Sequence, residues 1–184
     1  MKKTLIIVAH PNLERSVVNS KWLEKLKAYP ELYTVHDIYE AYPDEKIDVE
    51  AEQKLVENHD HIVFQFPLFW FSSPPLLKKW QDLVLTYGWA YGSSGNALIN
   101  KSFSLAVAVG IWEEDYQPTG RYLHTIEEVL RPFEMTVNYI KSRYLKPFFL
   151  FGTEPNAAMK ELSKKEIEQS AEDYHQHLQS LIGI

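Results

Sequence analysis

The chain has 184 residues, 45% hydrophobic and 24% charged, which predicts one globular domain over residues 1–184 with a sizeable core. It contains no cysteine, which excludes disulfides, thiolate metal sites and cysteine-based redox chemistry, so any redox function needs a bound cofactor. The net charge of −6, without a run of Lys or Arg, argues against a nucleic-acid partner.

Five β-prone apolar runs predict five strands. They lie at residues 4–9, 33–38, 61–66, 103–109 and 144–151. The first, third and fourth runs are continuously apolar, as expected for a parallel sheet that helices cover on both faces. The first run is shorter than the roughly seven residues that a secretory signal needs, and none approaches the roughly 18 of a membrane span. We therefore expect a cytoplasmic protein.

Helical patterns fill the gaps between these runs. Asp48 is a good N-cap for the second predicted helix, and Ser163 begins a capping box that opens the last one. Apolar spacing over residues 122–133 predicts another helix, which Pro132 should kink or end. The glycine- and aromatic-rich segment 85–102 predicts an insertion without regular structure.

This alternation of strands and helices predicts an α/β fold, a right-handed, doubly wound parallel sheet with helices on both faces. For a five-stranded sheet the leading strand order is the flavodoxin-like 2-1-3-4-5. Ligands of such folds bind at the carboxyl ends of the strands, where strands 1 and 3 diverge. The loops that follow the first, third and fourth strands therefore form the candidate site.

The loop after the third strand is the most informative segment of the chain. Three consecutive aromatics, Phe69, Trp70 and Phe71, follow Pro67, which cannot continue a central strand. Residues 72–74 (Ser-Ser-Pro) then supply the chemistry of a helix start. Aromatic side chains at a ligand-binding edge suit a flat ligand, although they would also suit a loop packed into the core.

The loop after the first strand leads into the N-terminus of a helix, where free N–H groups and the helix dipole favour an anion. His10, Arg15, Ser16 and Asn19 can add side-chain donors to a phosphate. The loop matches neither a Walker loop nor Gly-x-Gly-x-x-Gly, so nucleotide hydrolysis and the usual dinucleotide site lose support. Taken alone, it could equally be a simple capped helix beside a histidine.

The loop after the fourth strand contains Gly110, which allows the backbone to approach a ligand closely, and Tyr116, which offers a phenolic donor. Its acidic residues 113–115 favour a solvated loop. Together the three loops offer a phosphate cradle, an aromatic platform and a glycine-backed wall. Flavin mononucleotide (FMN) needs this combination, an anion site for its tail and a flat apolar slot for its ring.

At these residues the chain resembles the flavodoxin-like NAD(P)H:quinone oxidoreductases. The similar segments are residues 10–19, 65–78 and 88–92, and residues 39–44 and 47–53 are similar to the branch of ancillary subunits of glutathione-gated potassium-efflux systems. The resemblance implies a homodimer that binds FMN, or alternatively FAD, and uses NADH or NADPH. It implies reduction of quinones or similar soluble electrophiles by two-electron, ping-pong hydride transfer.

The resemblance also gives individual residues roles. The residues that match positions holding the flavin phosphate and ribityl chain are His10, Ser16, Val17, Val18 and Asn19. Those that match the two loops around the flavin ring are Pro67, Leu68, Phe69, Trp70 and Phe71, and Ala108, Val109, Gly110 and Ile111. Tyr116 matches a tyrosine that stabilises charge on the flavin during hydride transfer, and Tyr91 matches a residue that reaches the partner subunit's pocket.

Two positions depart from the pattern of the relatives. Residues 108–111 lack the Thr-Thr-Gly-Gly of many relatives, so threonine hydroxyl contacts are lost. The histidine that joins the catalytic tyrosine in relatives falls near Tyr122, and His124 is close in sequence. Either residue could therefore join Tyr116, or Tyr116 could act alone.

Two alternative functions stay open. The first is a regulatory flavin-binding subunit docked on a membrane potassium-efflux protein, peripheral at the inner face of the membrane. The second is an electron carrier, against which the insertion at residues 85–102 argues because carriers leave the flavin edge open. The other histidines predict no chemistry: His59 and His61 lack a third metal ligand, so no metal site is expected, and His175 and His177 are predicted to be solvated.

Overall fold

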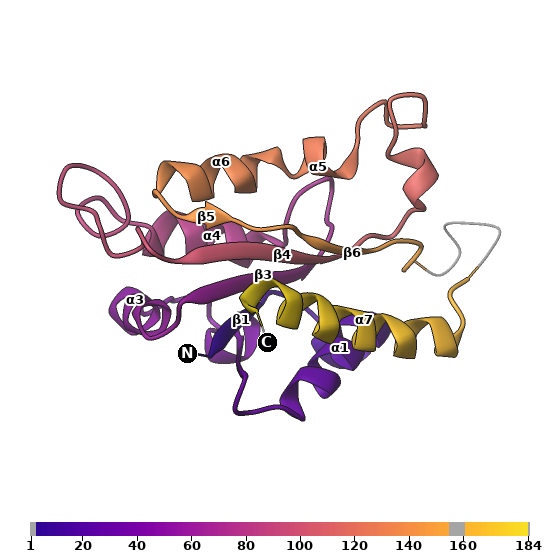
Figure 1. Cartoon of the computed structure of the whole chain (residues 1–184), viewed down its shortest axis with the longest axis horizontal. Helices are drawn as coiled ribbons and strands as arrows, with labels where there is room; N and C mark the ends of the chain where they lie inside the picture. The colour runs from indigo at the N-terminus through magenta and orange to yellow at the C-terminus, as the bar shows by residue number, and fades with distance from the viewer. Residues whose placement is uncertain (1–2, 155–160, 184) are drawn as a thin grey trace.

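The computed structural model describes residues 3–154 and 161–183. Its centre is a parallel sheet of order β2-β1-β3-β4-β5, which confirms the predicted order 2-1-3-4-5 (Figure 1). A sixth strand also pairs with β4. The strands are β1 (Thr4–Val8), β2 (Tyr33–Asp37), β3 (His61–Pro67), β4 (Ser102–Ala108), β5 (Arg143–Tyr144) and β6 (Phe148–Leu150).

The fifth predicted strand differs from the prediction, because it is broken into two short strands. Both β5 and β6 pair with β4, β5 near its start and β6 near its end. Between them, Leu145 N still donates to Phe103 O at 2.7 Å, but Pro147 has no N–H to continue the ladder. The continuous strand expected over residues 144–151 is therefore wrong.

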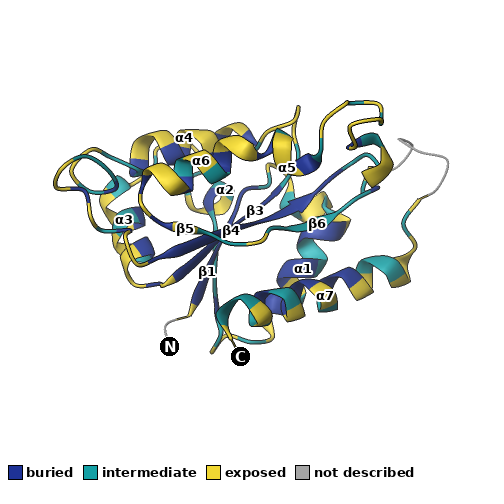
Figure 2. Cartoon of the chain, turned by 45° about the horizontal axis from the view of Figure 1, so that its top comes forward, coloured by how far each residue is buried: buried dark blue, intermediate teal, exposed yellow. Residues whose placement is uncertain are grey.

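Helices cover both faces of the sheet, as predicted (Figures 1 and 2). The α-helices are α1 (Val17–Lys27), α2 (Ile38–Ala41), α3 (Val49–Glu57), α4 (Pro75–Val84), α5 (Ile126–Val129), α6 (Arg131–Tyr139) and α7 (Lys164–Ile182). Short 3-10 turns form at η1 (Leu13–Arg15) and η2 (Glu113–Asp115). None of these helices is long and apolar enough to cross a membrane.

Local caps explain where several helices begin. Asp48 Oδ1 accepts from Ala51 N at the start of α3, and Ser163 forms the predicted capping box at the start of α7. The helix expected over residues 122–133 is instead two helices, α5 and α6, since Pro132 begins a new helix in its first turn rather than kinking one. Tyr122 lies outside both.

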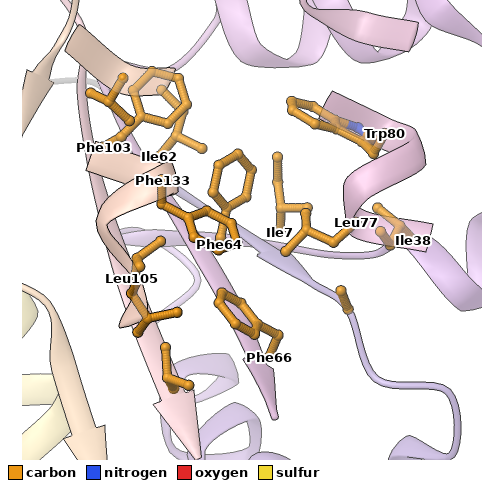
Figure 3. Close-up of a cluster of buried hydrophobic side chains, with 14 of the residues drawn as sticks. Ile7, Ile38, Ile62, Phe64, Phe66, Leu77, Trp80, Phe103, Leu105 and Phe133 are labelled. Carbon is orange, nitrogen blue, oxygen red and sulfur yellow. The ribbon is translucent and has the colours of Figure 1, made fainter. Parts of the chain in front are cut away.

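The core lies in two layers, one on each face of the sheet. Successive strand residues point to opposite faces, and both faces are apolar, which explains the continuous apolar runs. Beneath α4 and α6, aromatic rings interlock around Phe64, whose ring centroid lies 5.5 Å from that of Trp80 (Figure 3). On the other face Trp22, fully buried, packs between the sheet and α7. Each such buried side chain stabilises the fold by roughly 1.5–3 kcal/mol.

The insertion after α4 lies at the amino ends of the strands. It runs from the end of α4 directly into β4, and it forms the looped segment at the left of Figure 1. Lys141 Nζ holds it near the end of α6, within 3.4 Å of Gly92 O and 3.5 Å of Gly95 O. Within one chain, this segment is therefore at the opposite end of the sheet from the candidate site.

Candidate functional site

A cavity of about 1130 Å³ opens at the carboxyl ends of β1, β3 and β4. The loops that follow these three strands meet there, as the topology predicts. The predicted site residues that line it are His10, Ser16, Val17, Val18, Asn19, Pro67, Leu68, Phe69, Trp70, Ala108 and Gly110. Those that the cavity lining does not include are Phe71, Val109, Ile111 and Tyr116.

The first turn of α1 forms the polar end of the cavity. Ser16 is its N-cap, and Ser16 Oγ accepts from Asn19 N at 3.1 Å. Arg15 and Lys21 lie beside this turn on the cavity wall. Free N–H groups at a helix start, the helix dipole and the Arg15 cation together suit a bound anion, whereas Lys21 Nζ is paired with Glu24 at 2.8 Å.

His10 adds a donor at this end. Asn12 N donates to His10 Nδ1 at 3.1 Å, so the ring proton of the neutral histidine sits on Nε2. Burial lowers the pKa of His10, and the nearby Asp37 carboxylate opposes that shift. A neutral ring with its Nε2–H available can donate to a phosphate without carrying a charge.

The aromatic loop is a tight β-hairpin turn. Phe69 and Ser72 exchange two backbone hydrogen bonds of 2.8 and 2.9 Å, and Leu68 N donates to Ala108 O at 2.9 Å. The two central residues, Trp70 and Phe71, have φ of 47° and 61°. Such turns favour Asn-Gly, and each bulky left-handed residue costs on the order of 1–3 kcal/mol. Strain of this kind concentrates at functional sites, and Trp70 is 93% exposed beside the cavity.

A third wall, which the sequence did not predict, comes from the segment after β6. Gly152 N donates to Ile111 O, and Thr153 N donates to Val109 O, both at 3.1 Å. The Glu154 side chain lies over Gly110, where an added Cβ would come within 3.0 Å of Glu154 Oε2. The cavity lining from this region comprises Gly152, Thr153, Glu154, Glu161, Leu162, Lys164, Ile167 and Glu168. The one local signal is Gly152 itself, a glycine directly after a strand.

Tyr116 lies in an aromatic cluster behind the hairpin. It is 3% exposed, and its ring centroid lies 4.9 Å from that of Tyr122, which in turn lies 5.1 Å from that of Phe71. Burial raises the pKa of Tyr116 to about 12, so its hydroxyl keeps its proton at neutral pH. His124 has a 68% exposed side chain and lies 3.4 Å from Glu128 on the helix surface. Of the two candidate partners, Tyr122 is therefore the one in contact with Tyr116.

The remaining histidines pack into the fold. His175, predicted to be solvated, is 4% exposed, because it stacks on Tyr29 at 4.2 Å and lies 2.9 Å from the Tyr33 hydroxyl. That prediction is wrong, since α7 packs against α1 and the segment that follows it. His177 is half-buried, with Nε2 3.0 Å from Lys146 O. The described residues contain no group of three or more His, Cys, Asp or Glu that could hold a metal.

Comparison with known proteins identifies the relatives of this chain. The flavodoxin-like fold family matches residues 2–178. The uncharacterised NAD(P)H oxidoreductase YrkL of Bacillus subtilis is 52% identical over 92% of this chain and 94% of its own. The chain belongs to the flavodoxin-like NAD(P)H oxidoreductase family. Among further members of the family, the potassium-efflux ancillary protein KefG of Cronobacter sakazakii is 40% identical over 81% of this chain and 80% of its own.

Solved structures of the family agree with this fold. General stress protein 14 from Treponema denticola, solved in complex with FMN, is 47% identical and superposes with a TM-score of 0.89 over 97% of this chain and 99% of its own. An NADPH-quinone reductase from P. pentosaceus is 31% identical, with a TM-score of 0.82 over 95% and 96% of the two chains.

Proposed function

We propose that this protein binds FMN in the cavity and is an NAD(P)H oxidoreductase that reduces quinones or similar soluble electrophiles. The observation that carries the proposal is the union in one cavity of an anion-binding helix start, an aromatic hairpin and the wall at Gly110. The FMN complex of general stress protein 14 from Treponema denticola supports FMN rather than FAD as the cofactor. We take the electron donor, NADH or NADPH, from the names of the relatives, which are NAD(P)H- or NADPH-dependent.

In this proposal the first turn of α1 holds the phosphate of FMN. Ser16 and the free N–H groups of the turn, the Asn19 side chain and His10 Nε2–H donate to it, and Arg15 balances its charge. Val17 and Val18 border the ribityl chain. This is the only part of the cavity wall among the described residues with a helix N-cap, a histidine donor and an arginine together.

The flavin ring would lie between residues 67–71 and residues 108–111. Backbone groups of the two loops reach its polar edge, and Phe69 and Trp70 shield it from water. The chemistry supplied by bound FMN is two-electron hydride transfer from NAD(P)H to an acceptor, in a ping-pong sequence. The chain's own part is to orient the donor and the acceptor in turn and to stabilise the developing charge.

We propose that Tyr116 stabilises that charge and that Tyr122, rather than His124, assists it. As a neutral phenol, Tyr116 can donate a hydrogen bond throughout the neutral pH range. Tyr122 lies between Tyr116 and Phe71, and its contacts with both rings connect Tyr116 to the aromatic hairpin. The exposed position of His124, just before α5, favours Tyr122 as the second residue.

We further propose a homodimer in which the insertion of one chain approaches the hairpin of the other. Tyr87 and Tyr139 are 68% and 66% exposed, and both pack on Tyr91 with ring centroids within 5.8 Å. This patch and the exposed hairpin lie at opposite ends of the sheet. A two-fold axis can therefore bring each patch to its partner's hairpin and cover both. The argument against an electron carrier then depends on the dimer, since the insertion does not reach the cavity of its own chain.

A second candidate function is regulatory. The similarity to KefG of Cronobacter sakazakii, named as an ancillary protein of a glutathione-regulated potassium-efflux system, favours a role as an ancillary subunit of such a system. In that role the protein would be cytoplasmic and peripheral, and bound flavin would serve structure or sensing rather than turnover.

Cofactor loading and turnover test these proposals together. Purified protein is incubated with FMN and with FAD, desalted, and the bound flavin is identified by absorption and mass. NAD(P)H oxidation is then followed with a soluble quinone. Stoichiometric FMN with rapid turnover supports the enzyme, and colourless protein after both incubations overturns it. Bound FMN with negligible turnover on every quinone, together with co-purification of a potassium-efflux protein, supports the regulatory function.

A further inference from the structure

Gln65 is a fully buried polar residue near the carboxyl end of β3. Its neighbours Phe64 and Phe66 pack into the cluster beneath α4 and α6, so the Gln65 side chain points to the face covered by α1. Its amide nitrogen lies 3.2 Å from Asn19 O and 3.3 Å from Asn19 Oδ1. Gln65 thus ties the central strand to the first turn of α1.

These two contacts determine which way both amide groups point. A backbone carbonyl only accepts, so the Gln65 atom beside Asn19 O is its NH₂ nitrogen. That same nitrogen faces Asn19 Oδ1, which turns the oxygen of the Asn19 amide inward. Asn19 is 2% exposed and lines the cavity, and its NH₂ group is the end that remains for a ligand.

The backbone of Asn19 cannot supply that donor. Asn19 N already donates to Ser16 Oγ at 3.1 Å to cap the helix. The orientation of the side chain therefore decides whether this position offers the cavity a donor or an acceptor. An acceptor here would repel a phosphate, because phosphate oxygens only accept at neutral pH.

Packing alone does not explain a glutamine at this position. Its Oε1 is buried without a hydrogen-bond partner among residues 3–154 and 161–183. A buried unpaired acceptor is destabilising, and an apolar side chain of the same size would avoid it. On the same face of β3, Val63 is apolar, and the buried His61 has hydrogen-bond partners in Thr4 and Ser104. The amide at position 65 therefore carries a stability penalty that an apolar side chain would not.

We propose that Gln65 is a positioning residue that holds the Asn19 amide with its NH₂ group toward the cavity, so that α1 presents only donors to a phosphate. This inference rests on the proposed FMN site. It assigns Gln65 a role in selecting the phosphorylated flavin over riboflavin, which shares the ring and ribityl chain but lacks the phosphate.

The decisive variant is Gln65→Glu, which has nearly the same shape. Above the pKa of the introduced carboxyl, two acceptors would face Asn19 O and Oδ1, and the Asn19 amide would flip to donate inward. We expect the preference for FMN over riboflavin, measured as a ratio of affinities by flavin fluorescence at pH 8, to fall roughly ten- to a hundredfold. As the pH is lowered and the carboxyl protonates, it again donates to Asn19 O. The preference, relative to wild type at each pH, should then recover.

Two further variants keep the test decisive. Gln65→Met removes the donor without adding an acceptor, so we expect a smaller loss of preference that does not change with pH. Gln81→Glu is the matched control, a similarly buried glutamine on α4 beneath the other face of the sheet, and its preference should equal wild type.

Each outcome separates the inference from the proposed function. Wild-type protein that binds neither flavin, or binds both equally, overturns the proposed phosphate site. Wild-type protein that prefers FMN, with both Gln65 variants retaining that preference, overturns the role of Gln65 alone. Equal weakening of FMN and riboflavin in the Gln65 variants, with a lower melting temperature, would mean that Gln65 only supports the fold. If Gln65→Glu does not fold, the preference of Gln65→Met decides.

Discussion

The two ends of the parallel sheet differ in whether their buried polar side chains have hydrogen-bond partners within the protein. At the amino end, His61 is 3% exposed, yet its ring nitrogens lie 3.4 Å from Thr4 Oγ1 and 3.1 Å from Ser104 Oγ. The buried Lys101 donates to the backbone carbonyls of Glu57 and His59. These partners are all internal, so this end contributes stability and needs no ligand.

At the carboxyl end, a buried polar group lacks a hydrogen-bond partner and part of the backbone is strained. Gln65 Oε1 has no partner among the described residues, and Trp70 and Phe71 hold left-handed conformations at the centre of a hairpin. Together with the cavity, these features favour a region adapted to a ligand rather than to maximal stability. The comparison teaches that changes at the amino end should alter unfolding, while changes at the carboxyl end should alter flavin binding or turnover.

The largest expected effect is on the pH dependence of stability, at the amino end. Burial lowers the pKa of His61 to about 4, with further lowering by the charges of His177 and Arg143. In the unfolded chain the histidine pKa is about 6.5. Between about pH 4 and 6.5, His61 is therefore protonated in the unfolded chain but neutral in the folded one. Stability is therefore complete above about pH 6.5 and is lost as the pH falls toward 4, by roughly 3 kcal/mol.

Urea unfolding of wild type and His61→Gln at pH 7.5, 5.5 and 4 measures this contribution. We expect the wild type to lose about 3 kcal/mol more than the variant over that range, because glutamine does not titrate. Equal losses in the two proteins would mean that His61 is not the group responsible. FMN affinity at pH 7.5 should be the same in both.

The next effect is catalytic, at the carboxyl end. Tyr116→Phe removes the proposed donor, and we expect flavin reduction by NAD(P)H to slow by roughly ten- to a hundredfold, or about 1–3 kcal/mol, with FMN still bound. Because the pKa of Tyr116 is raised to about 12, the wild-type rate should show no Tyr116 titration below pH 10. Stopped-flow absorbance measures both.

His124→Ala serves as the control for that experiment, since its exposed side chain lies just before α5 and beside Glu128. We expect it to reduce flavin at nearly the wild-type rate. An unchanged rate in Tyr116→Phe together with a large drop in His124→Ala would reverse the assignment.

A smaller effect is expected at the helix cap. Ser16→Ala removes the oxygen that accepts from Asn19 N, which should cost about 1 kcal/mol of stability. The first turn of α1, which Ser16 caps, is also the proposed site for the phosphate of FMN. The variant should therefore bind FMN less tightly, while its affinity for riboflavin changes little. Calorimetric melting and fluorescence titration measure the two effects. A lower melting temperature without a change in FMN affinity would remove Ser16 from the site.

The smallest effect has the opposite sign. Trp70→Asn replaces a strained residue with one that tolerates φ of 47°, so we expect the free energy of unfolding to rise by about 0.5–1 kcal/mol. Trp70 is 93% exposed, so little packing is lost. Turnover should fall in the same variant. A variant that is less stable than wild type would show that the hairpin is not strained and would weaken the contrast between the two ends.

Much of the fold could be predicted because its signals are local. Apolar runs and capping residues such as Asp48 and Ser163 report on their own neighbourhood, and the strand order follows from the alternation of elements. The proline at position 147 is a local signal for a strand break, but the apolar residues on either side of it favoured the prediction of one continuous strand. The burial of His175 could not be predicted from the sequence of α7 alone, since it depends on contact with Tyr29, which follows α1.

The candidate site was predictable where one loop follows one strand, and less so where distant segments meet. Residues 10, 12, 15–19 and 67–70 line the cavity, whereas Phe71 does not. The wall formed by residues 152–154 arises from pairing with residues 109–111, some forty positions away, which no local pattern signals. Tyr116 was assigned a role by resemblance, but its position behind Tyr122 follows from packing around the 3-10 turn η2.

The interruption of the last strand at Pro147 bears on solubility. β5 and β6 form one outer edge of the sheet, and a long unbroken edge offers a row of free backbone groups to which another molecule can add a strand. Here the edge consists of a two-residue and a three-residue strand separated by Leu145, Lys146 and Pro147. The three phenylalanines that follow, Phe148, Phe149 and Phe151, would otherwise make this edge prone to cross-β aggregation. We expect the charge of Lys146 and the missing N–H of Pro147, immediately before them, to act against pairing of this edge with another strand.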